Sequence, residues 1–219
     1  MLTYEDIVKN EDIRTYIIEA DKSLHTLGFT EHSFAHVGKV ASVAEYILEE
    51  MGCDEHQITL AKIAAHLHDI GNLVNRQGHS LHGAVMAFRI LDNLGMPAKD
   101  ISTVVTAIGN HDEGTGVAVN AVAAALILGD KTDVRRSRVR NSDVSTFDIH
   151  DRVNYSVTKS SVIINEEKTA IILSLEIDTE FSAVMDYFEI FLDRMIMCRK
   201  ASETLGLRFR LVINGQQLL

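Results

Sequence analysis

Apolar residues at helical spacing, closed off by glycines, are the feature that most restricts how this 219-residue chain can fold. The chain has a single proline, Pro97, so its helices are free to run. The periodic segments stop at glycines where helices commonly end, namely Gly28, Gly52, Gly71 and Gly95. This pattern predicts six helices, over 12–27, 33–51, 54–69, 79–94, 97–109 and 120–134.

The character of the sequence changes after residue 140. Residues 142–152 read as an irregular connection, and the segments 153–165 and 169–178 are rich in β-branched residues, as in a β-hairpin. Thr179 is placed to cap a long helix over 180–205, and 207–213 alternates like a last strand. The predicted fold class is therefore mainly α: a helical bundle over 1–140, with a small α+β part over 141–219 packed on it.

Charge and cysteine usage exclude several classes of protein. The net charge of -10 argues against a general surface for nucleic acid or anionic membranes. Two cysteines, Cys53 and Cys198, are too few for a disulfide framework and suit a reducing cytosol. The acidic start of the chain is unlike a signal peptide, and no apolar run is long enough to span a bilayer. We therefore expect a cytoplasmic protein that binds neither nucleic acid nor membranes.

Histidines and aspartates recur at helix ends and on inward helix faces. Asp130 shares an apolar face with Ala123, Ile127 and Val134, where a carboxylate is costly to bury unless it is paired or metal-bound. A single ligand on each of several helices is how helical proteins build metal sites. Imidazole and carboxylate suit iron, manganese, cobalt, nickel or zinc, with magnesium a further candidate. We predict that a metal centre is formed by His36, His68, Asp69, His79, His111 and Asp130.

The order His36, then His68-Asp69, then Asp130 resembles the HD-domain superfamily of metal-dependent phosphohydrolases. The doublet stands in Leu67-His68-Asp69-Ile70-Gly71, and the last aspartate in Gly129-Asp130-Lys131. The similarity covers roughly residues 30–135. It implies that the helical part is an HD-domain bundle, and that one metal takes His36, His68, Asp69 and Asp130.

Two further matches resemble a bimetallic subclass, the HD-GYP proteins and HD-type dinucleoside polyphosphate hydrolases. The segment His79-Ser80-Leu81-His82-Gly83-Ala84 carries one, and His111 with the glycines that follow it carries the other. They imply a second metal that shares Asp69 as a bridge and takes His79 and His111; His82, one turn later, is the alternative to His79. The chain has Asn110 where HD-GYP proteins have a first histidine, Asn72 where they have a lysine, and no Gly-Tyr-Pro. These departures weaken the case for cyclic dinucleotide hydrolysis.

The resemblance implies hydrolysis of a phosphate ester or anhydride in a nucleotide or related small molecule. Asp69, with a metal-bound water, is the candidate catalytic residue. Arginine and lysine side chains balance charge on a phosphate, and an amide can bind it. The candidates for substrate binding are Asn72, Lys131, Arg135 and Arg138.

Several alternatives remain open from the sequence. The same ligand set suits a di-iron oxygenase of the HD fold, or a non-catalytic metal-dependent module that binds nucleotides and signals. The (p)ppGpp hydrolases are disfavoured, because their acidic pair is missing from Ile70-Gly71-Asn72-Leu73. The C-terminal part is expected to cover the site, to form a homodimer, or both. The other histidines are given no role in the metal centre. His66 is assigned a structural role, His25, His32 and His56 are assigned as surface or cap residues, and His150 with Asp151 is expected to hold the connection together.

Overall fold

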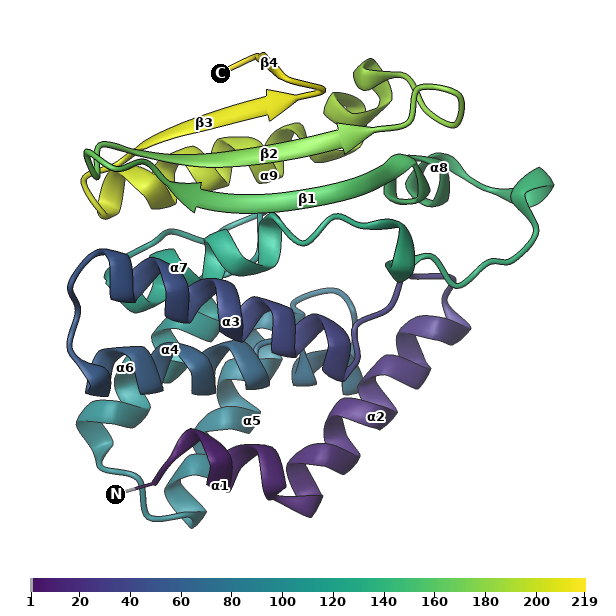
Figure 1. Cartoon of the computed structure of the whole chain (residues 1–219). Coiled ribbons are helices and arrows are strands. Elements are labelled where there is room, and N and C mark those ends of the chain that lie inside the picture. The colour runs from purple at the N-terminus through teal and green to yellow at the C-terminus, as the bar shows by residue number, and fades with distance from the viewer. Residues whose placement is uncertain (1) are drawn as a thin grey trace.

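The computed structural model describes residues 2–219, and the first part of this chain forms a bundle of helices (Figure 1). In chain order these are α1 (Tyr4–Lys9), α2 (Glu11–Thr26), α3 (Phe34–Glu50), α4 (Glu55–Leu67), η1 (Ile70–Leu73), α5 (His79–Asn93), α6 (Ala98–Gly109) and α7 (Ala121–Lys131). Side-chain caps fix several starts: Asp54 accepts from the Gln57 amide, and Asn120 from the Ala123 amide. The predicted helices are present, and α1 is an addition.

The chain then builds a four-stranded sheet with one long helix. Its elements are η2 (Arg136–Arg138), η3 (Val144–Thr146), α8 (Ile149–Ser156), β1 (Val157–Ile164), β2 (Ala170–Ile177), α9 (Val184–Thr204), β3 (Arg208–Ile213) and β4 (Gln216–Gln217). The strand order is β1-β2-β3-β4, with β1 antiparallel to β2 and β3 antiparallel to β4. Strands β2 and β3 pair in parallel, and α9 is the crossover between them. The predicted fold class is confirmed.

The sheet and α9 lie as a layer over one side of the helical bundle (Figure 1). Helix α9 packs against α7 on one side and against β2 and β3 on the other. Buried apolar side chains from both regions belong to one continuous core. The predicted boundary between two domains at residue 140 stays a prediction, because the two regions share that core.

Three local predictions are wrong. Residues 142–152 are not wholly irregular, because Asp148 accepts from the Asp151 amide and starts α8, which runs through Val153. The first strand therefore begins at Val157; a β-branched Val153 looks like strand but packs in a helix. Helix α9 starts at Val184, after Ala183, so Thr179 is not its cap. At α8 the polar cap of Asp148 overrides the β propensity of Val153.

Gly71 also has a different role from the predicted helix stop. Gly28, Gly52 and Gly95 have the positive φ of a helix end, but Gly71 lies inside η1 without it. A Cβ on Gly71 would stand 2.0 Å from the His79 carbonyl oxygen and 2.3 Å from the Gly83 nitrogen. The glycine is needed because the backbones of η1 and α5 almost touch there.

A second close approach brings α3 and α7 together. A Cβ on Gly129 would stand 2.8 Å from the carbonyl oxygen of Val40. Ala123, Ala124 and Ala125 of α7 are fully buried, and their small side chains let neighbouring helices approach. These small residues allow side chains from different helices to converge at one point in the bundle. Among residues 2–219, no helix is both long and apolar enough to cross a membrane.

Candidate metal centre

Six buried side chains from separate elements meet inside the bundle. One comes from α3, two from the junction of α4 and η1, and the others from the start of α5, the end of α6, and α7. They are His36, His68, Asp69, His79, His111 and Asp130, none of them more than 8% exposed. The structure thus brings together all the residues that the sequence nominated as metal ligands.

The first group of donor atoms surrounds the Nε2 atom of His36. This nitrogen lies 3.3 Å from Nε2 of His68, 3.6 Å from Oδ2 of Asp69 and 3.4 Å from Oδ1 of Asp130. Nε2 of His68 lies 3.3 Å from the same Asp69 oxygen. Donors held about 2.1 Å from a tetrahedral metal are separated by roughly 3.4 Å. The spacing of this group is that of a metal-ligand shell.

The second group uses the other oxygen of Asp69. The Nε2 atoms of His79 and His111 lie 3.1 Å apart. Oδ1 of Asp69 lies 3.6 Å from the first of these nitrogens and 4.0 Å from the second. Asp69 therefore presents Oδ2 to one group and Oδ1 to the other.

The hydrogen bonds of the imidazoles fix which nitrogen faces the centre. Nδ1 of His36 donates to Oδ2 of Asp133 at 2.8 Å. The other Nδ1 atoms donate to backbone carbonyls, His68 to Ala65 at 2.7 Å, His79 to Arg76 at 3.1 Å and His111 to Ile108 at 2.6 Å. Since carbonyls and carboxylates only accept, Nδ1 carries a proton in each ring, and in the neutral imidazole Nε2 therefore carries a lone pair toward the centre. Lone pairs at these distances repel unless a cation lies between them, so the donor set fits divalent metals that accept imidazole and carboxylate.

Electrostatics in the centre favour anionic carboxylates and a neutral His111, but they also favour protonation of His68. Burial would raise the pKa of the Asp130 carboxyl, but the Lys131 ammonium together with His36 and His68 outweighs it and holds that pKa well below its usual value. Burial, together with the positive charges of His68 and Lys131, holds the pKa of His111 well below its usual value. Burial opposes charge on His68, yet the carboxylates of Asp69 and Asp130 raise its pKa. The carboxylates are thus anionic at neutral pH, and they attract positive charge to this point.

Asp133 supports the centre, although no motif in the sequence singles it out. Besides accepting from His36, it accepts from Nε of Arg135 at 2.8 Å through its other oxygen. Nη1 of Arg138 donates to its backbone carbonyl at 2.8 Å. The available signal was a second aspartate, three residues after Asp130 and two residues before the arginine run. A carboxylate in this position fixes the tautomer of a metal-binding histidine and increases its basicity.

Replacing Asp133 with asparagine is expected to weaken metal binding about 10- to 100-fold, because the amide withdraws the charge that holds His36. Competition with a chromophoric chelator measures the affinity. Asp100→Asn is the matched control, since Oδ1 of Asp100 accepts from Nε2 of His56 at 2.9 Å away from the centre. That variant should bind metal like the unmodified protein. Equal affinity in the Asp133 variant would contradict the supporting role.

Two of the four substrate-binding candidates contact the ligands themselves. The amide nitrogen of Asn72 donates to Oδ1 of Asp69 at 3.0 Å and to its backbone carbonyl at 2.9 Å. Nζ of Lys131 lies 2.7 Å from Oδ2 of Asp130 and 3.3 Å from Oε1 of Glu113. Both side chains orient or neutralise a ligand in this structure, and their contact with substrate stays a prediction.

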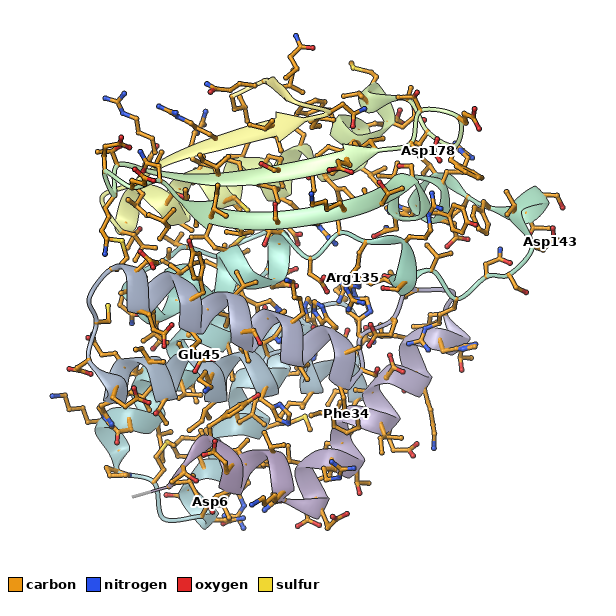
Figure 2. The ribbon with its side chains drawn as sticks, in the orientation of Figure 1. Asp6, Phe34, Glu45, Arg135, Asp143 and Asp178 are labelled. Atoms are coloured by element: carbon orange, nitrogen blue, oxygen red, sulfur yellow. The ribbon has the colours of Figure 1, made fainter. Side chains whose placement is uncertain are left out.

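The two arginine candidates lie on different sides of Asp133. Arg138 is buried and lines a cavity next to the centre. Arg135 pairs with Asp133 and Glu31 and lines a separate groove, between the bundle and the sheet (Figure 2). The structure therefore does not bring the two arginines to one phosphate-sized space. Arg138 is the one that lies on the cavity side.

His32 is a residue that the sequence placed at the surface and the structure places beside the centre. Its ring packs edge-on against that of His36, with 5.4 Å between centroids, and Nδ1 donates to the Thr30 carbonyl at 2.7 Å. It lines the same cavity as Arg138, which has a volume of about 340 Å³. No spacing rule reveals it, because it lies in a loop whose path depends on tertiary packing.

The remaining histidines stay outside the two groups. His66 is buried against Tyr4 and Phe34, and burial, helped by positive charge on His68 and Arg14, lowers its pKa to about 4. His82, which the sequence offered as the alternative to His79, is also outside, because His79 takes that place in the second group. His150 and Asp151 belong to α8 and line the cavity.

One comparison with known proteins identifies a family, and two others give similar proteins. A family model for the HD domain matches residues 33–153, more than half of the chain and a segment that contains all six ligand candidates. A protein of Methanocaldococcus jannaschii, named only as uncharacterized, is 26% identical, and the match covers 76% of this chain and 73% of that protein. A solved structure from an uncultured Thermotogales bacterium, a predicted HD superfamily hydrolase, is 26% identical with a TM-score of 0.44, over 57% of this chain and 67% of that one.

Proposed function

The chain belongs to the HD-domain family, and we propose from this that it is a metal-dependent phosphohydrolase. Its substrate would be a phosphate ester or anhydride of a nucleotide or a related small molecule. The observation that carries the proposal is Asp69, which presents one oxygen to each of two clustered ligand groups. A site that holds two cations side by side suits phosphoryl transfer, because the attacking and leaving oxygens both gain stabilisation.

The chain's own residues would hold the reacting groups in place. Divalent metals held here would polarise a phosphoryl oxygen and lower the pKa of bound water toward neutrality. Asn72 would hold Asp69 in place through one hydrogen bond to its Oδ1 and another to its backbone carbonyl. Lys131 neutralises Asp130 and so limits the negative charge that an incoming phosphate meets. Asp69 and Asp130 are the most exposed of the six ligands, so substrate would approach on the carboxylate side.

Metal removal is expected to abolish hydrolysis and to lower the melting temperature. Metal bound only by the folded chain stabilises it by about 4 kcal/mol at a thousandfold excess over Kd. Metal content is first measured on protein purified without added metals, and a panel of phosphomonoesters, phosphodiesters and nucleotides is then assayed for phosphate release. Chelation should stop turnover, and addition of Fe²⁺, Mn²⁺, Co²⁺, Ni²⁺ or Zn²⁺ should restore it for at least one metal.

Two outcomes of the same experiment would overturn the proposal. Oxygen uptake by the iron-loaded protein, without phosphate release, would assign it to the di-iron oxygenases. Tight nucleotide binding without turnover under any metal would assign it to non-catalytic binding modules.

A further inference from the structure

One cavity lies beside the metal centre, where the bundle meets α8 and α9. It is formed by the loop between α2 and α3, by Arg138, and by residues of α8 and α9. Its volume of about 340 Å³ is at the lower end of the range for small-molecule sites. Phe29 and the buried Phe191 give it apolar walls. The cavity is therefore of a size for one small ligand and too small for a polymer.

Three arginines line this cavity, and each is connected to a ligand of the metal centre. Nη1 of Arg76 donates at 3.2 Å to Asn72, which in turn holds Asp69. Arg138 donates to the Asp133 carbonyl, and the Asp133 carboxylate holds His36. In each case a single residue, Asn72 or Asp133, connects the guanidinium group to a predicted metal ligand.

The third arginine, Arg194, comes from α9. Its Nε lies 2.9 Å from Oε1 of Glu113, which pairs with Lys131 and through it with Asp130. Its guanidinium also lies over the ring of Phe191, 4.5 Å from the centroid. Arg194 belongs to a helix beyond residues 33–153, the segment that matches the HD family.

Each of these guanidinium groups is held on one edge and free on another. Within residues 2–219, Nη2 of Arg76, Nη2 of Arg138 and both terminal nitrogens of Arg194 make no hydrogen bond. Asp148 and Asp151 also line the cavity, but Asp148 caps α8 and Asp151 accepts from Asn141 at 3.4 Å. A fixed guanidinium with a free edge is suited to binding phosphate oxygens in pairs.

We propose that this cavity is the substrate site, that it takes a phosphate ester of about mononucleotide size, and that Arg194 positions the phosphate. The organic group of the ester lies against Phe29, which lines the cavity and is 39% exposed. Because α9 supplies Arg194, the C-terminal region takes part in choosing the substrate. The reaction at this site rests on the proposed phosphohydrolase function. The binding measurements that follow do not depend on it.

The test compares Arg194→Gln with Arg199→Gln in the full, metal-loaded chain. Arg199 is an exposed residue of the same helix, so its variant makes the same change of charge outside the cavity. Calorimetry measures the binding of inorganic phosphate and of adenosine 5′-monophosphate. Arg194→Gln should weaken both about tenfold or more, since hydrogen bonds to charged groups contribute most to such binding. Arg199→Gln should stay within about twofold of the unmodified protein.

Two more variants separate positioning from a structural effect. Arg194→Lys keeps the charge but loses the planar fork, and should bind phosphate with intermediate affinity. Phe29→Ala should weaken adenosine 5′-monophosphate binding while leaving inorganic phosphate unchanged. On any ester that the protein hydrolyses, Arg194→Gln should raise KM by the same factor and change kcat by less than about threefold. Metal content should be unchanged in all these variants.

The outcomes distinguish this inference from the proposed function. If Arg194→Gln and Arg199→Gln bind phosphate equally well, the role of Arg194 is wrong, whether or not the protein hydrolyses esters. If the unmodified protein binds neither probe at millimolar concentration, the cavity is not the substrate site. If it binds both, with the predicted losses, but releases no phosphate from any ester, the site stands and phosphohydrolysis fails.

Discussion

Replacing Asp69 with asparagine is expected to empty both metal positions and to reduce phosphate hydrolysis roughly a thousandfold. Asp69 supplies Oδ2 to the group of His36 and Oδ1 to the group of His79. The amide has the same shape but no charge and only one good ligand oxygen, so it cannot bridge two cations. Loss of several kcal/mol of transition-state stabilisation corresponds to that factor in rate. Elemental analysis and phosphate release measure the two effects.

Matched variants test whether the loss of metal and of hydrolysis comes from a change at the metal centre itself. His68→Gln and His66→Gln make the same change at two buried residues of one short segment, but only His68 faces the ligands. The first should lose metal, and the second should keep it. His79→Gln should lose one ion of two, since it belongs to the second group alone. An Asp69→Asn protein that keeps both ions, or that still turns over normally, would refute the bridging role.

Replacing Gly71 with alanine is expected to lower the free energy of unfolding by about 3 kcal/mol and to weaken the second metal position. The added Cβ would stand 2.0 Å from the His79 carbonyl oxygen and 2.3 Å from the Gly83 nitrogen. Both are backbone atoms, so the first turn of α5 has to move as a whole. His79 begins that turn, and its Nε2 would leave His111. Urea unfolding and metal stoichiometry measure the two consequences.

Gly38 provides the control for this prediction. It lies within α3, and a Cβ there meets nothing within 4 Å. Gly38→Ala should therefore stabilise the protein by roughly 0.5–1 kcal/mol, because alanine favours a helix interior. Metal content should not change. If Gly71→Ala behaves like Gly38→Ala, the contact between η1 and α5 is not tight, and the glycine has no steric role.

The histidines and aspartates of the centre were predictable because each stands at a recognisable place in a helix. Asp130 interrupts an apolar face, and His68-Asp69 ends a periodic segment. Asp133 and His32 were not predictable in this way. Asp133 follows the end of α7, and His32 lies in a loop. Their proximity to His36 depends on how α3, α7 and that loop pack.

The C-terminal region shows the same difference between local and distant causes. The β-branched segments indicated strands and the amphipathic pattern after them indicated a long helix, and the structure has both. The parallel pairing of β2 with β3, and the contact of Arg194 with Glu113, were not visible in the sequence. Both join residues far apart in the chain, so no local pattern encodes them.

The sequence by itself determined most of the helices, the glycine ends at Gly28, Gly52 and Gly95, and the set of residues able to bind metal. Those properties follow from the helical repeat, from capping and from the chemistry of single side chains, all of which act within a few residues. Only the tertiary structure decided that Asp69 divides its two oxygens between two groups, and that α9 brings an arginine to the cavity beside them. These distances are set by close helix packing at Gly71 and Gly129, where small residues let distant backbones meet.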